Sequence, residues 1–154
     1  MKKLSLLLIF LFAGFVTTSA QEKGQWALGP AMKVYANTGM GGVVGLGPVV
    51  RVNLLDGLRL EPSVMILTAR GTSVDVSCNI QYAFEVAPKW YLYPIAGISF
   101  NDIQDFAFGF NLGGGFDYSL GYHWDLYLNV NWLAECASKL RNPVVSTLGI
   151  TYKF

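Results

Sequence analysis

The sequence ends in the stretch Leu148-Gly149-Ile150-Thr151-Tyr152-Lys153-Phe154. Large apolar side chains occupy every second position of this stretch, and small or polar side chains lie between them. Successive side chains of a β-strand point to opposite faces of the sheet. The pattern therefore predicts a strand with one apolar and one polar face, which continues to an aromatic last residue.

The same alternation recurs along most of the chain and predicts eight strands. It is strongest in segment 73–86, where Val, Cys, Ile, Tyr and Phe alternate with Asp, Ser, Asn and Gln. Gly, Pro, Asn and Asp mark the breaks between segments, as expected of turns. The expected strands cover residues 25–37, 42–54, 58–70, 73–86, 89–100, 106–119, 123–134 and 143–154. Segment 89–100 is ambiguous, because large side chains occupy both of its faces.

The distribution of bulk between the two faces indicates which of them points outward. The apolar face carries the large side chains, whereas the other face is rich in Gly, Ala, Ser and Asn and also holds the charges. An eight-stranded barrel is just wide enough inside for side chains to fill. We therefore predict an all-β fold, an eight-stranded antiparallel transmembrane up-and-down β-barrel with its apolar face towards lipid. The alternative is a soluble periplasmic ligand-binding barrel, with the apolar face inside.

Aromatic residues near the strand ends agree with the membrane interpretation. Trp and Tyr gather at both interfaces of membrane proteins. The expected interface aromatics are Trp26, Trp90, Trp124, Trp132 and Tyr152. An even number of strands puts both termini on one side, which is the periplasm for a barrel of the bacterial outer membrane.

The first twenty residues have the features of a cleaved secretory signal. Lys2 and Lys3 precede an apolar run, and small residues follow at 17–20. Such a segment is too short for a transmembrane helix. We expect a signal peptide at 1–20, cleaved before Gln21, export to the periplasm and one barrel domain at 21–154.

The charges on the small-residue face are expected to meet inside the barrel. They comprise four basic and five acidic residues: Lys33, Arg51, Arg59, Glu61, Asp75, Glu85, Asp117, Asp125 and Lys153. Because unpaired buried charge is costly, these groups should pair. Arg59 and Glu61 lie two residues apart on one strand and are a plausible pair. Two functions remain open, a lumen plugged by side chains with a structural or interaction role, and a narrow porin-like pore for ions or small solutes.

Composition and motifs point away from catalysis and nucleic acid. The chain is 53% hydrophobic and 14% charged, with a formal net charge of +1, and no basic patch is evident. Its single histidine, His123, has no adjacent Ser and acid that would form a triad. One His and the separated Cys78 and Cys136 do not make a metal site. We expect no enzyme activity, no cofactor, no nucleic-acid partner and a monomer in contact with outer-membrane lipid.

Several stretches resemble a known family. Residues 74–84, 93–98, 110–115 and the terminal 148–154 look like the small eight-stranded barrels of the OmpA/OmpX type. They are most similar to the "outer membrane protein beta-barrel domain" or porin-like proteins common in Bacteroides and relatives. This resemblance implies an outer-membrane location and insertion by the barrel assembly machinery, with Phe154 as the recognition residue. It implies no catalytic residues.

Overall fold

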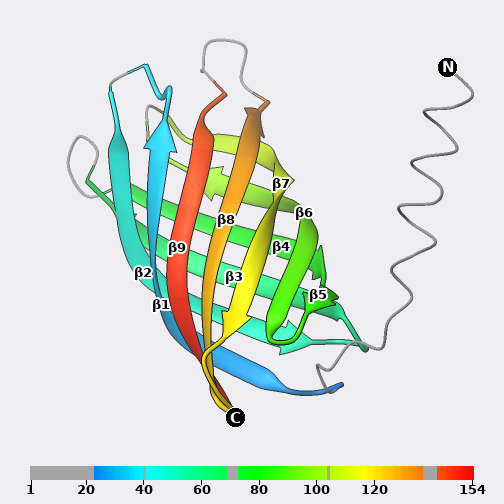
Figure 1. Cartoon of the computed structure of the whole chain (residues 1–154). Helices are drawn as coiled ribbons and strands as arrows, with labels where there is room; N and C mark the ends of the chain where they lie inside the picture. The colour runs from blue at the N-terminus through cyan, green and yellow to red at the C-terminus, as the bar shows by residue number, and fades with distance from the viewer. Residues whose placement is uncertain (1–22, 40, 69–72, 104, 137–141) are drawn as a thin grey trace, which may run out of the picture.

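The computed structural model describes residues 23–39, 41–68, 73–103, 105–136 and 142–154. The expected signal peptide at 1–20 lies outside these ranges. Within them, no helix is long and apolar enough to cross a membrane. The structure consists of strands and short turns (Figure 1).

Nine strands form one antiparallel sheet that closes on itself. Hydrogen-bonded neighbours follow the order β4-β3-β2-β1-β9-β8-β7-β6-β5, and a further pairing of β4 with β6 closes the barrel. Figure 1 shows the strands tilted around the barrel. The strands are β1 (Trp26–Ala36), β2 (Val43–Asn53), β3 (Leu58–Leu67), β4 (Ser73–Tyr82), β5 (Phe84–Ala87), β6 (Trp90–Asn101), β7 (Ala107–Ser119), β8 (Trp124–Glu135) and β9 (Val144–Lys153).

The barrel has eight strand positions, because β4 and β5 together fill one of them. The sequence predicts a single strand over 73–86, and this prediction is wrong at Ala83. The Ala83 N–H donates to the carbonyl oxygen of Gly57 at 2.7 Å, in the turn that precedes β3. β3 begins at Leu58, so β5 has no β3 neighbour and pairs with β6 alone. The eight-stranded antiparallel barrel is nevertheless confirmed.

The start of β1 and the end of β9 lie at the same end of the barrel, which we call the terminal end. There the Phe154 N–H donates to the Trp26 carbonyl oxygen at 2.9 Å, and β9 ends beside the start of β1. The turns β2–β3, β5–β6 and β7–β8 lie at the same end, and the Ser119 N–H reaches the Lys89 carbonyl oxygen at 2.9 Å. At the opposite end, the distal end, β1, β3, β6 and β8 end and β2, β4, β7 and β9 begin.

The apolar face points outward, as predicted. On β4, Ile80 is 51% exposed whereas its neighbour Asn79 is 2% exposed. Burial also resolves the ambiguous segment: Tyr93 is buried inside the barrel, and Leu92 lies on the outer wall. The small residues of the inner face make room for large inward side chains such as Tyr93.

Two inward glycines show how tightly the interior is filled. A Cβ added to Gly149 would lie 2.4 Å from the ring of Tyr127. A Cβ added to Gly115 would lie 2.2 Å from the amide oxygen of Asn129 and 2.7 Å from the ring of Tyr93. All three distances are far below van der Waals contact, so the lumen has this filling only because these two positions lack side chains.

Candidate functional site: the lumen of the barrel

The inward charges gather into three separate groups along the barrel axis. A central group contains Arg51, Arg59, Glu61 and Asp117; a distal group contains Lys33 and Asp75; a terminal group contains Asp125 and Lys153. Each group contains as many basic as acidic side chains. The lumen is thus divided into electrically neutral layers.

Asp117 is the centre of the central group. Its side chain is fully buried, and it contacts both guanidinium groups, Arg51 at 3.2 Å and Arg59 more closely. The hydroxyl of Tyr93 donates to the same carboxylate at 2.7 Å. Three donors from three strands therefore converge on one carboxylate, which satisfies most of its hydrogen-bonding capacity.

Arg51 links Asp117 to the second acid of the group. Its Nε lies 2.7 Å from Glu61, and the amide of Asn129 donates to Glu61 at 3.2 Å. The sequence suggested that Glu61 pairs with Arg59, but Arg59 instead contacts Asp117 and Gln81. Glu61 lies opposite Asn79 in the β3–β4 register, and Arg59 opposite Gln81. Arg59 reaches across the barrel to Asp117 on β7, whereas Glu61 pairs with Arg51 on the neighbouring strand β2.

Aromatic rings support the two guanidinium groups. The guanidinium carbon of Arg51 lies 3.8 Å from the ring centre of Tyr127, and that of Arg59 lies 4.2 Å from the ring centre of Tyr93. Such cation–π contacts stabilise a desolvated cation by up to about 2 kcal/mol. Together with the ion pairs, they make the central group a layer of contacting buried side chains.

The distal group is built around Lys33. Its ammonium lies 2.8 Å from Asp75, 2.6 Å from the Ser77 hydroxyl and 3.0 Å from the Ser63 hydroxyl. These three partners lie on β3 and β4, and Tyr35 on β1 donates to Asp75 at 2.8 Å. This buried ammonium thus has three polar partners, as its burial requires.

The terminal group lies at the mouth of the barrel. Lys153 contacts Asp125 at 2.8 Å, and Ser119 donates to the same carboxylate at 2.6 Å. The side chain of Lys153 is 14% exposed, more than any other member of the ion pairs. Glu85, the remaining predicted inward charge, is half-buried on β5.

An apolar layer closes the distal end of the lumen. Six side chains from five strands and one turn are buried together there: Tyr35, Val43, Leu67, Ile103, Leu133 and Val145. Ile103 belongs to the β6–β7 connection, where its N–H donates to the Asn101 side chain at 3.3 Å. The polar lumen predicted from the sequence therefore extends from the terminal mouth through the central group to the distal group, and the apolar layer lies beyond Lys33 and Asp75.

The terminal mouth leads to a very small cavity. It has a volume of about 10 Å³ and is bordered by residues that include Arg51, Arg59, Asp125 and Lys153. A cavity needs roughly 10–15 Å³ to hold one water molecule. A hydrated ion is larger and does not fit in this cavity.

The predicted interface aromatics lie on the outer wall. Trp26, Trp90 and Trp124 begin β1, β6 and β8 at the terminal end, whereas Trp132 lies towards the distal end of β8. The ring of Tyr152 lies 5.0 Å from that of Trp124, 5.2 Å from that of Phe154 and 5.3 Å from that of His123, each measured between centroids. His123 is exposed, and its Nδ1 lies 3.3 Å from the Lys153 carbonyl oxygen.

No ligand set for a metal is present in the part of the chain that the structure describes. Cys78 is half-buried on the outer wall, Cys136 is exposed beyond β8, and both thiols are free.

Two sets of lumen residues were not predicted from the sequence. Tyr93 lies in the segment whose register was ambiguous, yet its hydroxyl joins the central group. Large side chains occupy both faces of this segment, and Pro94 lacks the N–H of a ladder hydrogen bond, so the alternation does not show which face points inward. The apolar layer was missed because Val43, Leu133 and Val145 share their faces with polar residues.

Comparison with known proteins supports the fold. No protein-family model and no curated protein matches the sequence. The fold is similar to the N-terminal β-barrel domain of Pseudomonas aeruginosa OprF, with a TM-score of 0.69 at 16% identity, covering 87% of this chain and 100% of that one. It is similar to the outer membrane protein OprG from Pseudomonas aeruginosa, with a TM-score of 0.59 at 12% identity, covering 90% and 99%.

A designed protein has the same architecture. A de novo transmembrane β-barrel gives a TM-score of 0.67 at 16% identity, covering 87% of this chain and 98% of that one. At these identities the likeness shows the fold. The natural examples are outer-membrane proteins, so the resemblance to small outer-membrane barrels holds at the level of architecture.

Proposed function

We propose that this chain is an integral protein of the bacterial outer membrane with a closed lumen and a structural or interaction role. The observation that carries the proposal is the reversal of the usual burial pattern. Ile66 on the outer wall is 62% exposed, whereas Arg59 on the same strand is 2% exposed. A soluble barrel would place these side chains the other way round, because exposing large apolar groups to water is unfavourable.

The orientation in the membrane follows from the two ends. The terminal end faces the periplasm, and the distal connections face the exterior. Phe154, exposed at the terminal end, is the residue we assign to recognition by the barrel assembly machinery. The proposal includes no catalytic residue and no cofactor, and the chain acts as a monomer.

Closure of the lumen is the second part of the proposal. It is supported by three neutral ion-pair groups, the buried rings of Tyr93 and Tyr127, and the apolar layer at the distal end. The porin-like alternative requires a continuous path through these layers, and the cavity at the terminal mouth is too small for a hydrated ion.

Two experiments test the proposal. The mature chain should fractionate with outer membranes and migrate differently on gels before and after boiling; recovery in the aqueous fraction with unchanged mobility would refute membrane insertion. Planar-bilayer recordings should show no steady unit conductance. The control variant is Leu46→Ala, at an outward site on the same strand as Arg51. A conductance that changes in Arg51→Ala but not in Leu46→Ala would mean that ions pass through the lumen, and would refute closure.

A further inference from the structure

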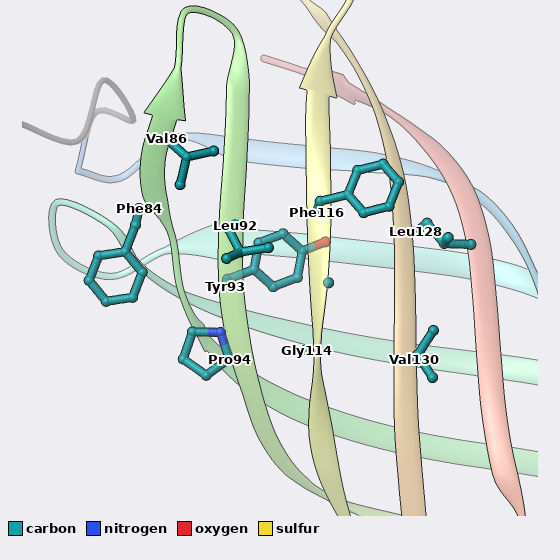
Figure 2. A pocket seen from close by; sticks show the side chains of 10 residues that line it. Phe84, Val86, Leu92, Tyr93, Pro94, Gly114, Phe116, Leu128 and Val130 are labelled. Carbon is teal, nitrogen blue, oxygen red and sulfur yellow. The ribbon is translucent and has the colours of Figure 1, made fainter. Parts of the chain in front are cut away.

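A groove interrupts the outer wall of the barrel near its terminal end. It crosses β5, β6, β7 and β8 and has a volume of about 520 Å³, within the usual range of small-molecule sites, about 300–1,000 Å³. Figure 2 shows its sides, which include Phe84, Leu92, Phe116 and Val130.

The floor of the groove lies where two outward positions have little side chain. Pro94 and Gly114 are direct partners in the β6–β7 register, and Gly114 is the partner of Val130 on β8. Larger side chains stand around them, since Leu92 and Phe116 form the next outward pair along the same two strands. A convex wall thus has a local hollow that spans about three strand spacings, roughly 14 Å.

The lining of the groove selects a hydrocarbon occupant. Apart from Tyr93, every side chain that borders it is apolar. The hydroxyl of Tyr93 points away into the lumen, where it bonds to Asp117. A ligand in the groove therefore meets no hydrogen-bonding side chain and gains only from burial of apolar surface.

A cation lies just beyond the terminal end of the groove. Lys89 is exposed at the tip of the β5–β6 hairpin, three residues from Val86 and three from Leu92, which both border the groove. Three residues of chain span at most about 10 Å. The nearest carboxylate on the hairpin, Glu85, lies opposite the inward Tyr91 and so belongs to the other face. Lys89 lies in the turn and is exposed, so its charge is accessible from the aqueous side of the terminal end.

Aromatic rings place the membrane interface between the groove and this cation. The ring of Trp90 lies 4.8 Å from that of Tyr118 and 6.0 Å from that of Phe116. Trp and Tyr prefer the headgroup level of a bilayer. The groove then lies on the hydrocarbon side of this level and Lys89 on the aqueous side, as a lipid with an apolar chain and an anionic headgroup requires.

We infer that the groove binds one acyl chain of an anionic glycerophospholipid in the periplasmic leaflet, with its phosphate at Lys89. This inference rests on the proposed membrane insertion and deepens it by naming a specific lipid site. Lipid elsewhere around the barrel is bound only by the general apolar wall.

The test uses the full mature chain reconstituted in vesicles of phosphatidylglycerol and phosphatidylethanolamine in equal amounts. After extraction into mild detergent, native mass spectrometry counts the phospholipids retained by each barrel. The wild type should retain one phosphatidylglycerol. Val130→Trp fills the groove and should lower this retention about tenfold or more, a change of about 1.4 kcal/mol in binding.

The matched control is Val76→Trp on β4. Val76 is 46% exposed and Val130 is 48% exposed, both on the outer wall, but Val76 does not border the groove. Val76→Trp should retain lipid like the wild type. If Val130→Trp fails to fold, Val86→Trp fills the groove from the hairpin instead, and the same loss is expected.

Lys89→Asn tests the headgroup contact. Lys89 has a φ of 70°, a left-handed conformation that Asn adopts more readily than most residues, so the turn should persist. The variant should retain phosphatidylethanolamine as often as phosphatidylglycerol. An undiminished preference for phosphatidylglycerol would overturn the role of Lys89.

Other outcomes separate this inference from the function it rests on. Equal retention in Val130→Trp, Val86→Trp and Val76→Trp would overturn the lipid site while leaving membrane insertion intact. Loss of a dimer rather than of a lipid in Val130→Trp would mean that a second copy occupies the groove, and would also overturn it. Failure of the wild type to insert into vesicles would overturn the proposed function itself.

Discussion

Replacing Asp117 by Asn tests the packing of the lumen most severely. Asp117 is fully buried and accepts hydrogen bonds from Arg51, Arg59 and Tyr93. Asn keeps the shape of the side chain but removes its charge, so two guanidinium groups then face one carboxylate, that of Glu61. The central group changes from neutral to a net charge of +1.

The expected loss of stability follows from these contacts. Two charge-assisted hydrogen bonds contribute about 1.5–3 kcal/mol each, and removing one partner of a buried ion pair costs about 3–5 kcal/mol. We expect Asp117→Asn to lower the free energy of unfolding by about 3–5 kcal/mol. The assay is reversible urea unfolding in detergent micelles, followed by tryptophan fluorescence.

A control and a second variant make this prediction specific. Asp125→Asn removes the same charge at the terminal mouth, where Lys153 is partly exposed, and should cost less, about 1.5–3 kcal/mol. Adding Arg59→Gln to Asp117→Asn restores neutrality and should recover about 1–3 kcal/mol. The reasoning is refuted if Asp117→Asn costs no more than Asp125→Asn, or if the double variant recovers nothing.

Two further substitutions test the inner filling and the outer wall. Gly149→Ala drives a methyl group to 2.4 Å from the Tyr127 ring and should lower stability by about 1–3 kcal/mol in the same assay. The control Gly121→Ala, with no atom within 4 Å, should change stability by less than about 0.5 kcal/mol. Equal effects of the two variants would contradict a filled lumen. Leu112→Arg puts a charge on the middle of the outer wall and should lower the free energy of unfolding in vesicles by about 2–4 kcal/mol. The control Tyr122→Arg, in an exposed turn, should cost little. Tolerance of Leu112→Arg would argue against contact of this wall with lipid.

Much of the barrel was predictable because two-residue periodicity reports directly on strand faces. Segment 123–134 alternates without interruption, and the burial of Tyr127 and Asn129 inside the barrel follows from it. The break at Ala83 was not predictable in this way. It depends on where β3 starts, since the turn before Leu58 supplies the carbonyl that binds Ala83.

The charge groups show the limit of the same reasoning. Periodicity indicates that Arg59, Glu61 and Asp117 share the lumen, but partner choice depends on which strands face each other across the barrel. Asp117 lies on β7 and Arg59 on β3, strands that are not hydrogen-bonded to each other. Their contact is set by the diameter and stagger of the closed barrel, which a single strand does not encode.

The outer groove could not be read from the sequence either. The alternation of segment 106–119 puts Gly114 on the outward face, but nothing in the sequence marks it as the partner of Pro94. The apolar layer at the distal end depends likewise on Ile103 turning inward from a short connection.

The most direct measurement of the whole account is labelling of paired single-cysteine variants from lipid and from water. Cys78→Ala and Cys136→Ser give a cysteine-free chain, into which Ile80→Cys or Asn79→Cys is introduced. A thiol probe dissolved in the bilayer should label the cysteine at position 80 and spare the one at position 79. Labelling of position 79 with protection of position 80 would contradict an apolar wall facing lipid.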